Sequence, residues 1–95
     1  MKRLQAEIHE WQQRTFGDAN TVPGLVAHLR EEAQELAADP ESDEELADVA
    51  ILAFGIAATR GVDLETVVRA KLALLRQRTW GEPDADGVIR HVSGA

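Results

Sequence analysis

The 95-residue chain lacks cysteine and tyrosine, and it has only two tryptophans and two phenylalanines. The absence of cysteine excludes disulfide bonds and thiolate metal sites. Basic residues are also few: ten lysines and arginines stand against 17 aspartates and glutamates, which gives a formal net charge of −7. A binder of nucleic-acid polymers would show a basic face, so the composition argues against that class. A phosphorylated small molecule is still compatible with the composition, because a bound metal can reverse the local charge.

Long apolar runs are absent as well. No segment approaches the ~18 consecutive apolar residues of a membrane span, and the first residues, MKRLQAEIHEW, lack the continuous apolar core of a secretory signal. We therefore expect a cytoplasmic protein without a membrane partner. The length favours one domain over residues 1–95. Because a core of this size is small, we also expect identical chains to associate.

Apolar residues recur at helical spacing in four segments. The first helix is predicted over about residues 2–15, with Leu4, Ile8 and Trp11 on one face. The other three are predicted from near residue 23 to 38, from 42 to about 60 and from 64 to 80. Ser42 has capping-box spacing to Glu45, and Asp63 is a good N-cap for the last helix.

Between the first two helices the sequence is typical of a loop, and beyond residue 80 we expect an ordered tail lying over a neighbouring surface. No segment shows the alternation of a strand. The fold class predicted is all-α, a four-helix bundle-like arrangement with a short C-terminal tail.

Carboxylates interrupt the apolar stripes of the second and third helices. At ~100° per residue, the stripes consist of Leu25, Leu29 and Leu36 in one helix and Val49, Leu52 and Ile56 in the other. Glu32 fills the missing position of the first stripe, and Glu45 lies one turn before the second. Each is followed at i+3 by another acid, Glu35 or Asp48. Antiparallel packing of the two stripes would therefore bring four carboxylates together.

Four anions cannot share a low-dielectric crevice unless they are protonated or neutralised by cations. A metal ion is the simplest neutraliser, and donors that are all oxygens suit Mg²⁺ or Mn²⁺. The main competing site, that of di-iron bundles, uses Glu-x-x-His on two of its helices. Here the spacings are Glu32-x-x-Glu35 and Glu45-x-x-Asp48, so the pattern counts against iron.

The fourth helix adds the opposite charge. Lys71 and Arg78 continue the line of Leu64, Val68 and Leu75. Two cations on a line that faces the interior, near four acids, suggest a bound polyphosphate held by metals on one side and by these cations on the other.

Simpler interpretations stay open for single residues. Glu31 is most simply a solvated helix residue, and Glu45 has a second role as the capping partner of Ser42. Lys71 could extend its amine into water while its stem packs. Trp11, Arg14 and Phe16 are candidates for contacts with a base, although packing is the simpler role for the aromatic rings.

The motif Glu31-Glu32-x-x-Glu35, followed by Glu45-x-x-Asp48, resembles the signature of the all-α nucleoside triphosphate pyrophosphohydrolases, the MazG-like superfamily. The stretches HLREEAQEL and EELADVAIL and the ending Lys71…Arg78-x-Trp80 fit this signature. The stretches EWQQRTFG and PDADGVIRHV look closest to its dATP/dGTP diphosphohydrolase-like branch. The resemblance covers most of the chain.

The resemblance implies hydrolysis of a (deoxy)nucleoside triphosphate to the monophosphate and pyrophosphate, by a water whose pKa the metal lowers. It implies that Mg²⁺, with Mn²⁺ as a substitute, is held by Glu32, Glu35, Glu45 and Asp48. It also implies catalytic roles for Glu31, Glu32 and Glu35, and contacts of the nucleotide with Lys71, Arg78, Trp11 and Arg14. Relatives of this kind work as homodimers or homotetramers, and house-cleaning of the nucleotide pool is the expected role.

Two positions depart from the pattern of many relatives. Gly55 stands where they have an aspartate, which removes a possible extra metal ligand, and Leu75 stands where they have an asparagine. Two alternatives therefore remain. One is a phosphoribosyl-ATP pyrophosphohydrolase, which shares the fold and the bond chemistry. The other is a catalytically silent helical module that binds nucleotides or a partner protein.

Overall fold

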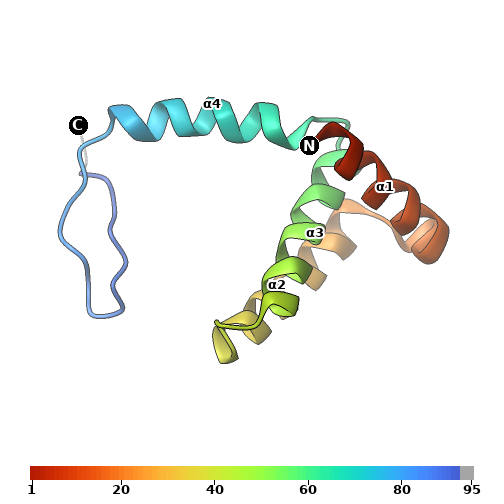
Figure 1. Ribbon diagram of the computed structural model, residues 1–95, viewed down its shortest axis with the longest axis horizontal. Coiled ribbons are helices and arrows are strands. Elements are labelled where there is room, and N and C mark those ends of the chain that lie inside the picture. The colour runs from red at the N-terminus through yellow and green to blue at the C-terminus, as the bar shows by residue number, and fades with distance from the viewer. Residues whose placement is uncertain (93–95) are drawn as a thin grey trace.

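The computed structural model describes residues 1–92, and helices dominate that part of the chain (Figure 1). The elements are α1 (Lys2–Phe16), the 3₁₀ turn η1 (Gly17–Ala19), α2 (Val22–Ala38), α3 (Asp43–Thr59) and α4 (Leu64–Gln77). The predicted all-α class is therefore confirmed, and the observed helix bounds lie close to those expected. None of the helices in residues 1–92 combines the length and the apolar character needed to cross a membrane.

Side-chain caps fix where three of the helices begin. The hydroxyls of Thr21 and Ser42 and the carboxylate of Asp63 each accept a hydrogen bond of 3.2 Å from the backbone N–H three residues later. Such caps satisfy the donors that the first turn leaves free. The caps at Ser42 and Asp63 were predicted from the sequence. The second bond of the expected capping box is not formed, because the Ser42 N–H donates to the Asp39 carbonyl at 3.1 Å instead of to the Glu45 side chain.

The predicted end of the last helix, at Trp80, is wrong. The helix ends at Gln77, because Arg78 adopts an extended conformation with φ −86° and ψ 151°. Trp80 instead pairs with His91 in an antiparallel bridge.

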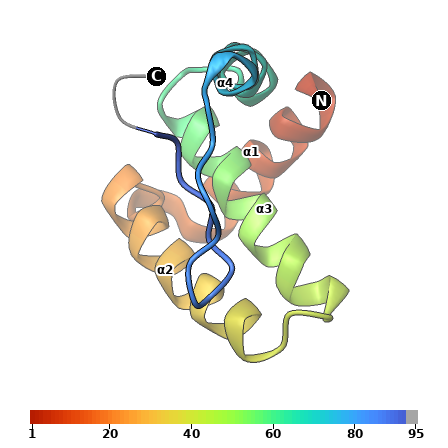
Figure 2. The same ribbon diagram turned by 90° about the vertical axis from the view of Figure 1, so that its left-hand side faces the viewer.

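Three helices, α1, α2 and α3, pack together with the turn η1, and we call these four elements the three-helix body. The antiparallel pair of α2 and α3 carries α1 on one side (Figures 1 and 2). The buried apolar residues are Ile8, Leu25, Leu52, Phe54 and Ala57. On α1 the observed face differs from the expected one, because Leu4 and Trp11 are 47% and 54% exposed while Gln12 is 1% exposed.

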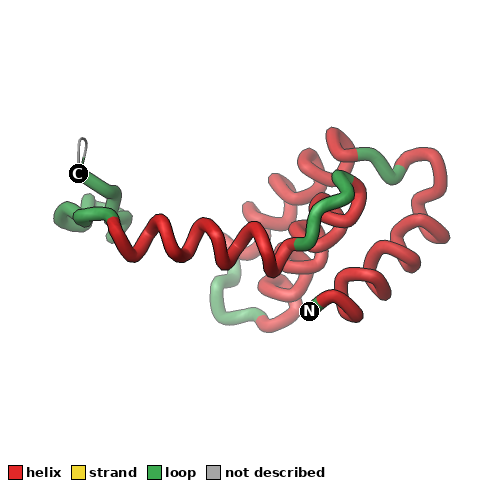
Figure 3. The backbone as a smooth tube through the Cα atoms, turned by 90° about the horizontal axis from the view of Figure 1, so that it is seen from above, coloured by secondary structure: helices red, strands yellow, loops and turns green. Residues whose placement is uncertain are grey.

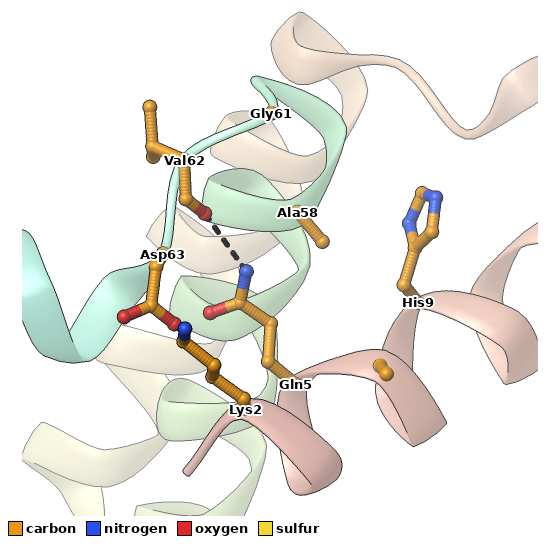
Figure 4. A pocket seen from close by; sticks show the side chains of 8 residues that line it. Lys2, Gln5, His9, Ala58, Gly61, Val62 and Asp63 are labelled. Carbon is orange, nitrogen blue, oxygen red and sulfur yellow. Dashed lines mark hydrogen bonds between the residues drawn. The ribbon is translucent and has the colours of Figure 1, made fainter.

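The fourth helix leaves this body as an arm (Figures 1 and 3). Its direction is set where it begins, since the Gln5 side chain donates to the Val62 carbonyl at 2.8 Å (Figure 4) and accepts from the Leu64 N–H at 2.9 Å. No residue of α4 is buried within the described chain. The radius of gyration is 15.7 Å, whereas a compact chain of this length would have ~12–13 Å.

The tail beyond α4 folds back on itself. Gly81 donates to the carbonyl of Arg90 at 2.9 Å and Val92 to that of Thr79 at 2.8 Å, while the Asp84 carboxylate accepts from Arg90 at 2.7 Å. From the sequence, the residues beyond residue 80 were expected to form an ordered tail over a neighbouring surface. In the single chain the tail lies at the far end of α4, away from the three-helix body (Figures 1 and 3). Residues 93–95 of the predicted tail lie outside the described residues.

Candidate metal centre

Three carboxylates meet between α2 and α3. Glu32 and Glu35 on α2 and Glu45 on α3 each offer an oxygen, and these oxygens lie within 4.8 Å of one another. Asp48, one turn further along α3, lines a cavity together with Glu32. The geometry follows from the stripes, because an acid inside the apolar face of each helix must face the other helix of an antiparallel pair.

Crowding and burial make the charged form of two of these acids unfavourable. The pKa of Glu32 is raised, chiefly because a protonated Glu32 could share a hydrogen bond with the Glu35 carboxyl, and further by burial and by the charges of Glu35 and Asp48. The His28 ring, 3.2 Å from the carboxylate of Glu32, acts in the opposite direction. Burial, followed by the charge of Glu35, raises the pKa of Glu45. The cluster therefore favours a cation or a proton over four free anions.

The donor set fits a hard divalent cation. The Glu32 side chain is only 15% exposed, and Oε2 of Glu32 and Oε2 of Glu45 are buried without a hydrogen-bond partner among the described residues. An unpaired buried carboxylate oxygen is costly, and a cation would satisfy it. Oxygen donors of this kind suit Mg²⁺ and Mn²⁺.

A cavity of about 120 Å³ opens beside the acids. It is lined by Trp11, Gln12, Phe16, His28, Glu32, Asp48, Ile51 and Leu52. The Trp11 and Phe16 rings meet edge to face with centroids 5.5 Å apart. Aromatic rings of α1 and carboxylates of α2 and α3 therefore line the same cavity, which suits a base beside the rings and phosphates beside the acids.

A larger cavity, of about 330 Å³, lies between α1 and the turn before α4 (Figure 4). Its acid is Asp63, which is already used as the cap of α4. The carboxylate cluster lies elsewhere, so the smaller cavity is the candidate site.

The remaining predicted site residues lie outside the acid group. Glu31 is exposed on α2, and Arg14 is exposed and paired with Glu10. Lys71 and Arg78 are on or just after α4, which follows the last turn of α3, whereas Glu45 is in the first turn. Because α4 extends away from the three-helix body (Figures 1 and 3), a single chain does not bring Lys71 to the cluster.

Three of the lining residues, Gln12, His28 and Ile51, were not picked out from the sequence, and the most buried of them is Gln12. It lies at i+4 from Ile8, as favourable for a shared face as the i+3 position of Trp11. The rule that places apolar residues inside selected the tryptophan, although the structure buries the glutamine.

Comparisons with known proteins show which family the chain resembles. A family model described as dATP/dGTP pyrophosphohydrolase matches residues 4–94. The chain is 42% identical to a dATP/dGTP diphosphohydrolase of cyanophage S-2L over 94 residues, or 97% of this chain and 88% of the relative. A dATP/dGTP diphosphohydrolase of Salmonella phage PMBT28 is 38% identical over 90 residues, which cover 94% of this chain and 30% of that longer protein.

A solved structure is also similar. It is the cyanophage S-2L MazG-like pyrophosphohydrolase bound to dGDP and three catalytic Mn²⁺ ions per active site. The match has a TM-score of 0.84 and 41% identity, and it covers 98% of this chain and 92% of that chain.

The raised pKa values predict how the metal-free protein responds to pH. Because folded Glu32 and Glu45 hold protons more tightly than the unfolded chain, their contribution to stability grows as the pH falls from neutral through their raised pKa values toward ~4. In EDTA, the melting temperature should rise on mild acidification. Glu32→Gln and Glu45→Gln should each raise it at neutral pH and weaken the pH dependence, while Glu44→Gln, in the same first turn of α3, should not. Lower melting temperatures in both variants would mean that the acids stabilise the fold by pairing.

Proposed function

The chain belongs to the dATP/dGTP pyrophosphohydrolase family and is a nucleotide pyrophosphohydrolase, and from that premise we propose that it cleaves dATP, dGTP or both to the monophosphate and pyrophosphate. The observation that carries the proposal is the group of carboxylates within 4.8 Å on α2 and α3, beside a cavity with an aromatic end. Its role would be the removal of surplus or non-standard deoxynucleotides.

Divalent metal is the second part of the proposal. Glu32, Glu35, Glu45 and Asp48 would hold Mg²⁺ or Mn²⁺, and the similar cyanophage structure with Mn²⁺ supports this assignment. When bound, the metal would neutralise phosphate charge and make a water more acidic. Glu32 and Glu45, both half-buried, would fix the ligand geometry, while the exposed Glu35 and Asp48 would face the phosphates.

The residues around this cluster have proposed roles in orienting the reactants. His28 holds the Glu32 carboxylate by a hydrogen bond. Trp11 and Phe16 would pack against the base, and Arg14 would exchange its exposed pairing with Glu10 for the nucleotide, since exposed ion pairs are weak. The exposed Glu31 would take up the proton that the attacking water releases when pyrophosphate, or the monophosphate, leaves.

The two alternatives are less well supported. The similar proteins described above are dATP/dGTP enzymes or a MazG-like pyrophosphohydrolase. This similarity weakens the hypothesis that the substrate is phosphoribosyl-ATP. The oxygens of Glu32 and Glu45 that lack partners are better explained by an active metal site than by a silent module.

The first test of the proposed function joins turnover to metal binding. With Mg²⁺ or Mn²⁺, the protein should release pyrophosphate from dATP or dGTP in a screen of canonical nucleoside triphosphates and phosphoribosyl-ATP. Glu45→Gln should abolish metal binding by calorimetry and lower turnover at least about a hundredfold, since even outer partners of metal ligands contribute ~10–100-fold. Glu44→Gln is the matched control and should keep both. Turnover of phosphoribosyl-ATP alone, or none with metal bound, would contradict the proposal.

The arm points to a second copy of the chain as part of the site. On α4, the Val68 and Leu72 residues are 53% and 40% exposed to solvent. A helix with one apolar face needs another surface to cover that face. Helix α4 also carries Lys71 and, just beyond its end, Arg78, opposite in charge to the cluster. We propose a homodimer, or a homotetramer built from dimers, in which the arm of one copy brings these cations to the acids of the other. A two-fold axis would complete both sites at once.

Mixed oligomers test this arrangement. Lys71→Met keeps the apolar stem, and both Lys71→Met and Glu45→Gln homo-oligomers should be nearly inactive. If the cations act in trans, refolding the two variants together should restore about a quarter of wild-type activity, because about half of the dimers are mixed and each of those has one intact site. No recovery, in mixtures whose exchange is shown by tagged subunits, would contradict a trans arrangement.

A further inference from the structure

The most deeply buried large side chain of the described residues is polar. Gln12 of α1 is 1% exposed and lies between α1 and α3. Its Oε1 is buried without a hydrogen-bond partner among the described residues. Native structures rarely leave such an acceptor unpaired, so each exception needs an explanation.

The opposing helix is shaped to admit this side chain. A Cβ at Gly55 would lie 2.0 Å from Oε1 and 2.6 Å from Cδ of Gln12. The carboxamide therefore occupies the space that any side chain at position 55 would need. Gly55 lies inside α3 with an ordinary backbone φ, and glycine weakens a helix interior. Room for the carboxamide, rather than a turn, accounts for the glycine.

Gln12 also lines the cavity that the aromatic pair and two of the carboxylates share. The cavity holds about 120 Å³, well above the ~10–15 Å³ that one water needs. Trp11 and Phe16 form its aromatic side, and Glu32 and Asp48 form its acidic side. A nucleotide with its phosphates at the acids would direct its base toward Trp11 and Phe16, and Gln12, which follows Trp11 in α1, lines the same cavity.

We propose that Gln12 reads the base and that its carboxamide accepts both adenine and guanine. The inference rests on the proposed function. Adenine presents an N6–H donor next to the N1 acceptor, and guanine presents the O6 acceptor next to an N1–H donor. A carboxamide has one oxygen acceptor and one NH₂ donor. Rotation about its last side-chain torsion, which has broad and roughly two-fold preferences, matches it to either edge.

The same chemistry explains selection by size. A pyrimidine carries equivalent donor and acceptor pairs, but one ring closer to the sugar. With its phosphates held at the acids, its edge would not reach Gln12. Gln12 is thus a specificity-determining residue for purines, and Gly55 is the residue that gives it room.

A cycle that pairs a change in the enzyme with a change in the substrate tests this contact. In the wild type, replacing dATP by its analogue that lacks the 6-amino group should lower kcat/KM roughly two- to tenfold, the range for one neutral hydrogen bond. In Gln12→Met the two substrates should be turned over at nearly equal kcat/KM, and the preference for dATP and dGTP over dCTP should shrink. Gly55→Ala, whose Cβ displaces the flexible end of Gln12, should give the same loss of discrimination with a folded protein.

Gln13→Met is the matched control for structural damage. Gln13 is a glutamine of the same helix whose Oε1 accepts a hydrogen bond of 3.0 Å from Asn20, so its loss should lower stability without changing the substrate ratios. A wild-type preference for the 6-amino group that persists in Gln12→Met would overturn the inference and leave the proposed function intact. Absence of any wild-type turnover of dATP and dGTP would overturn both.

Discussion

Mutual repulsion among carboxylates on two packed helices is the constraint on which this structure depends. Glu32, Glu35 and Glu45 lie within 4.8 Å of one another, and burial and crowding raise the pKa of Glu32 and of Glu45. The apolar stripes of α2 and α3 bring the acids together when the helices pack. The favourable packing of the helix pair is therefore partly offset by repulsion between the carboxylates. A cation reverses the balance, which makes the same contact a source of instability without metal and a binding site with it.

The positive charges that would balance the acids lie on the arm, which is α4 and the residues just after it. The body supplies acids and an aromatic cavity, whereas the cations lie on and just after a helix with no fully buried residue in the described part of the chain. Gln5 fixes the junction from which the arm leaves, so its direction is built into the fold. A second chain would cover the apolar face of α4 and complete the charge pattern of the site in one step.

Local features of the fold were predictable from the sequence, and the longer-range ones were not. Helical spacing and the caps at Ser42 and Asp63 gave the helix starts, because both depend on near neighbours in the chain. The acids at Glu32 and Glu45 were predictable as a group because they interrupt apolar stripes. The direction of α4 depends on hydrogen bonds from Gln5, 57 and 59 residues away in sequence. Gln12 was missed because its burial depends on the space left at Gly55, which no local pattern reports.

Anomalous scattering at the manganese edge, from crystals of the wild-type protein grown with Mn²⁺, tests the central claim most directly. The account predicts anomalous peaks between α2 and α3, with oxygens of Glu32, Glu35, Glu45 and Asp48 at coordination distances of ~2.0–2.3 Å. Peaks confined to other parts of the molecule, such as the cavity of Lys2, His9 and Asp63, would contradict it. So would full occupancy of that site in crystals of Glu45→Gln.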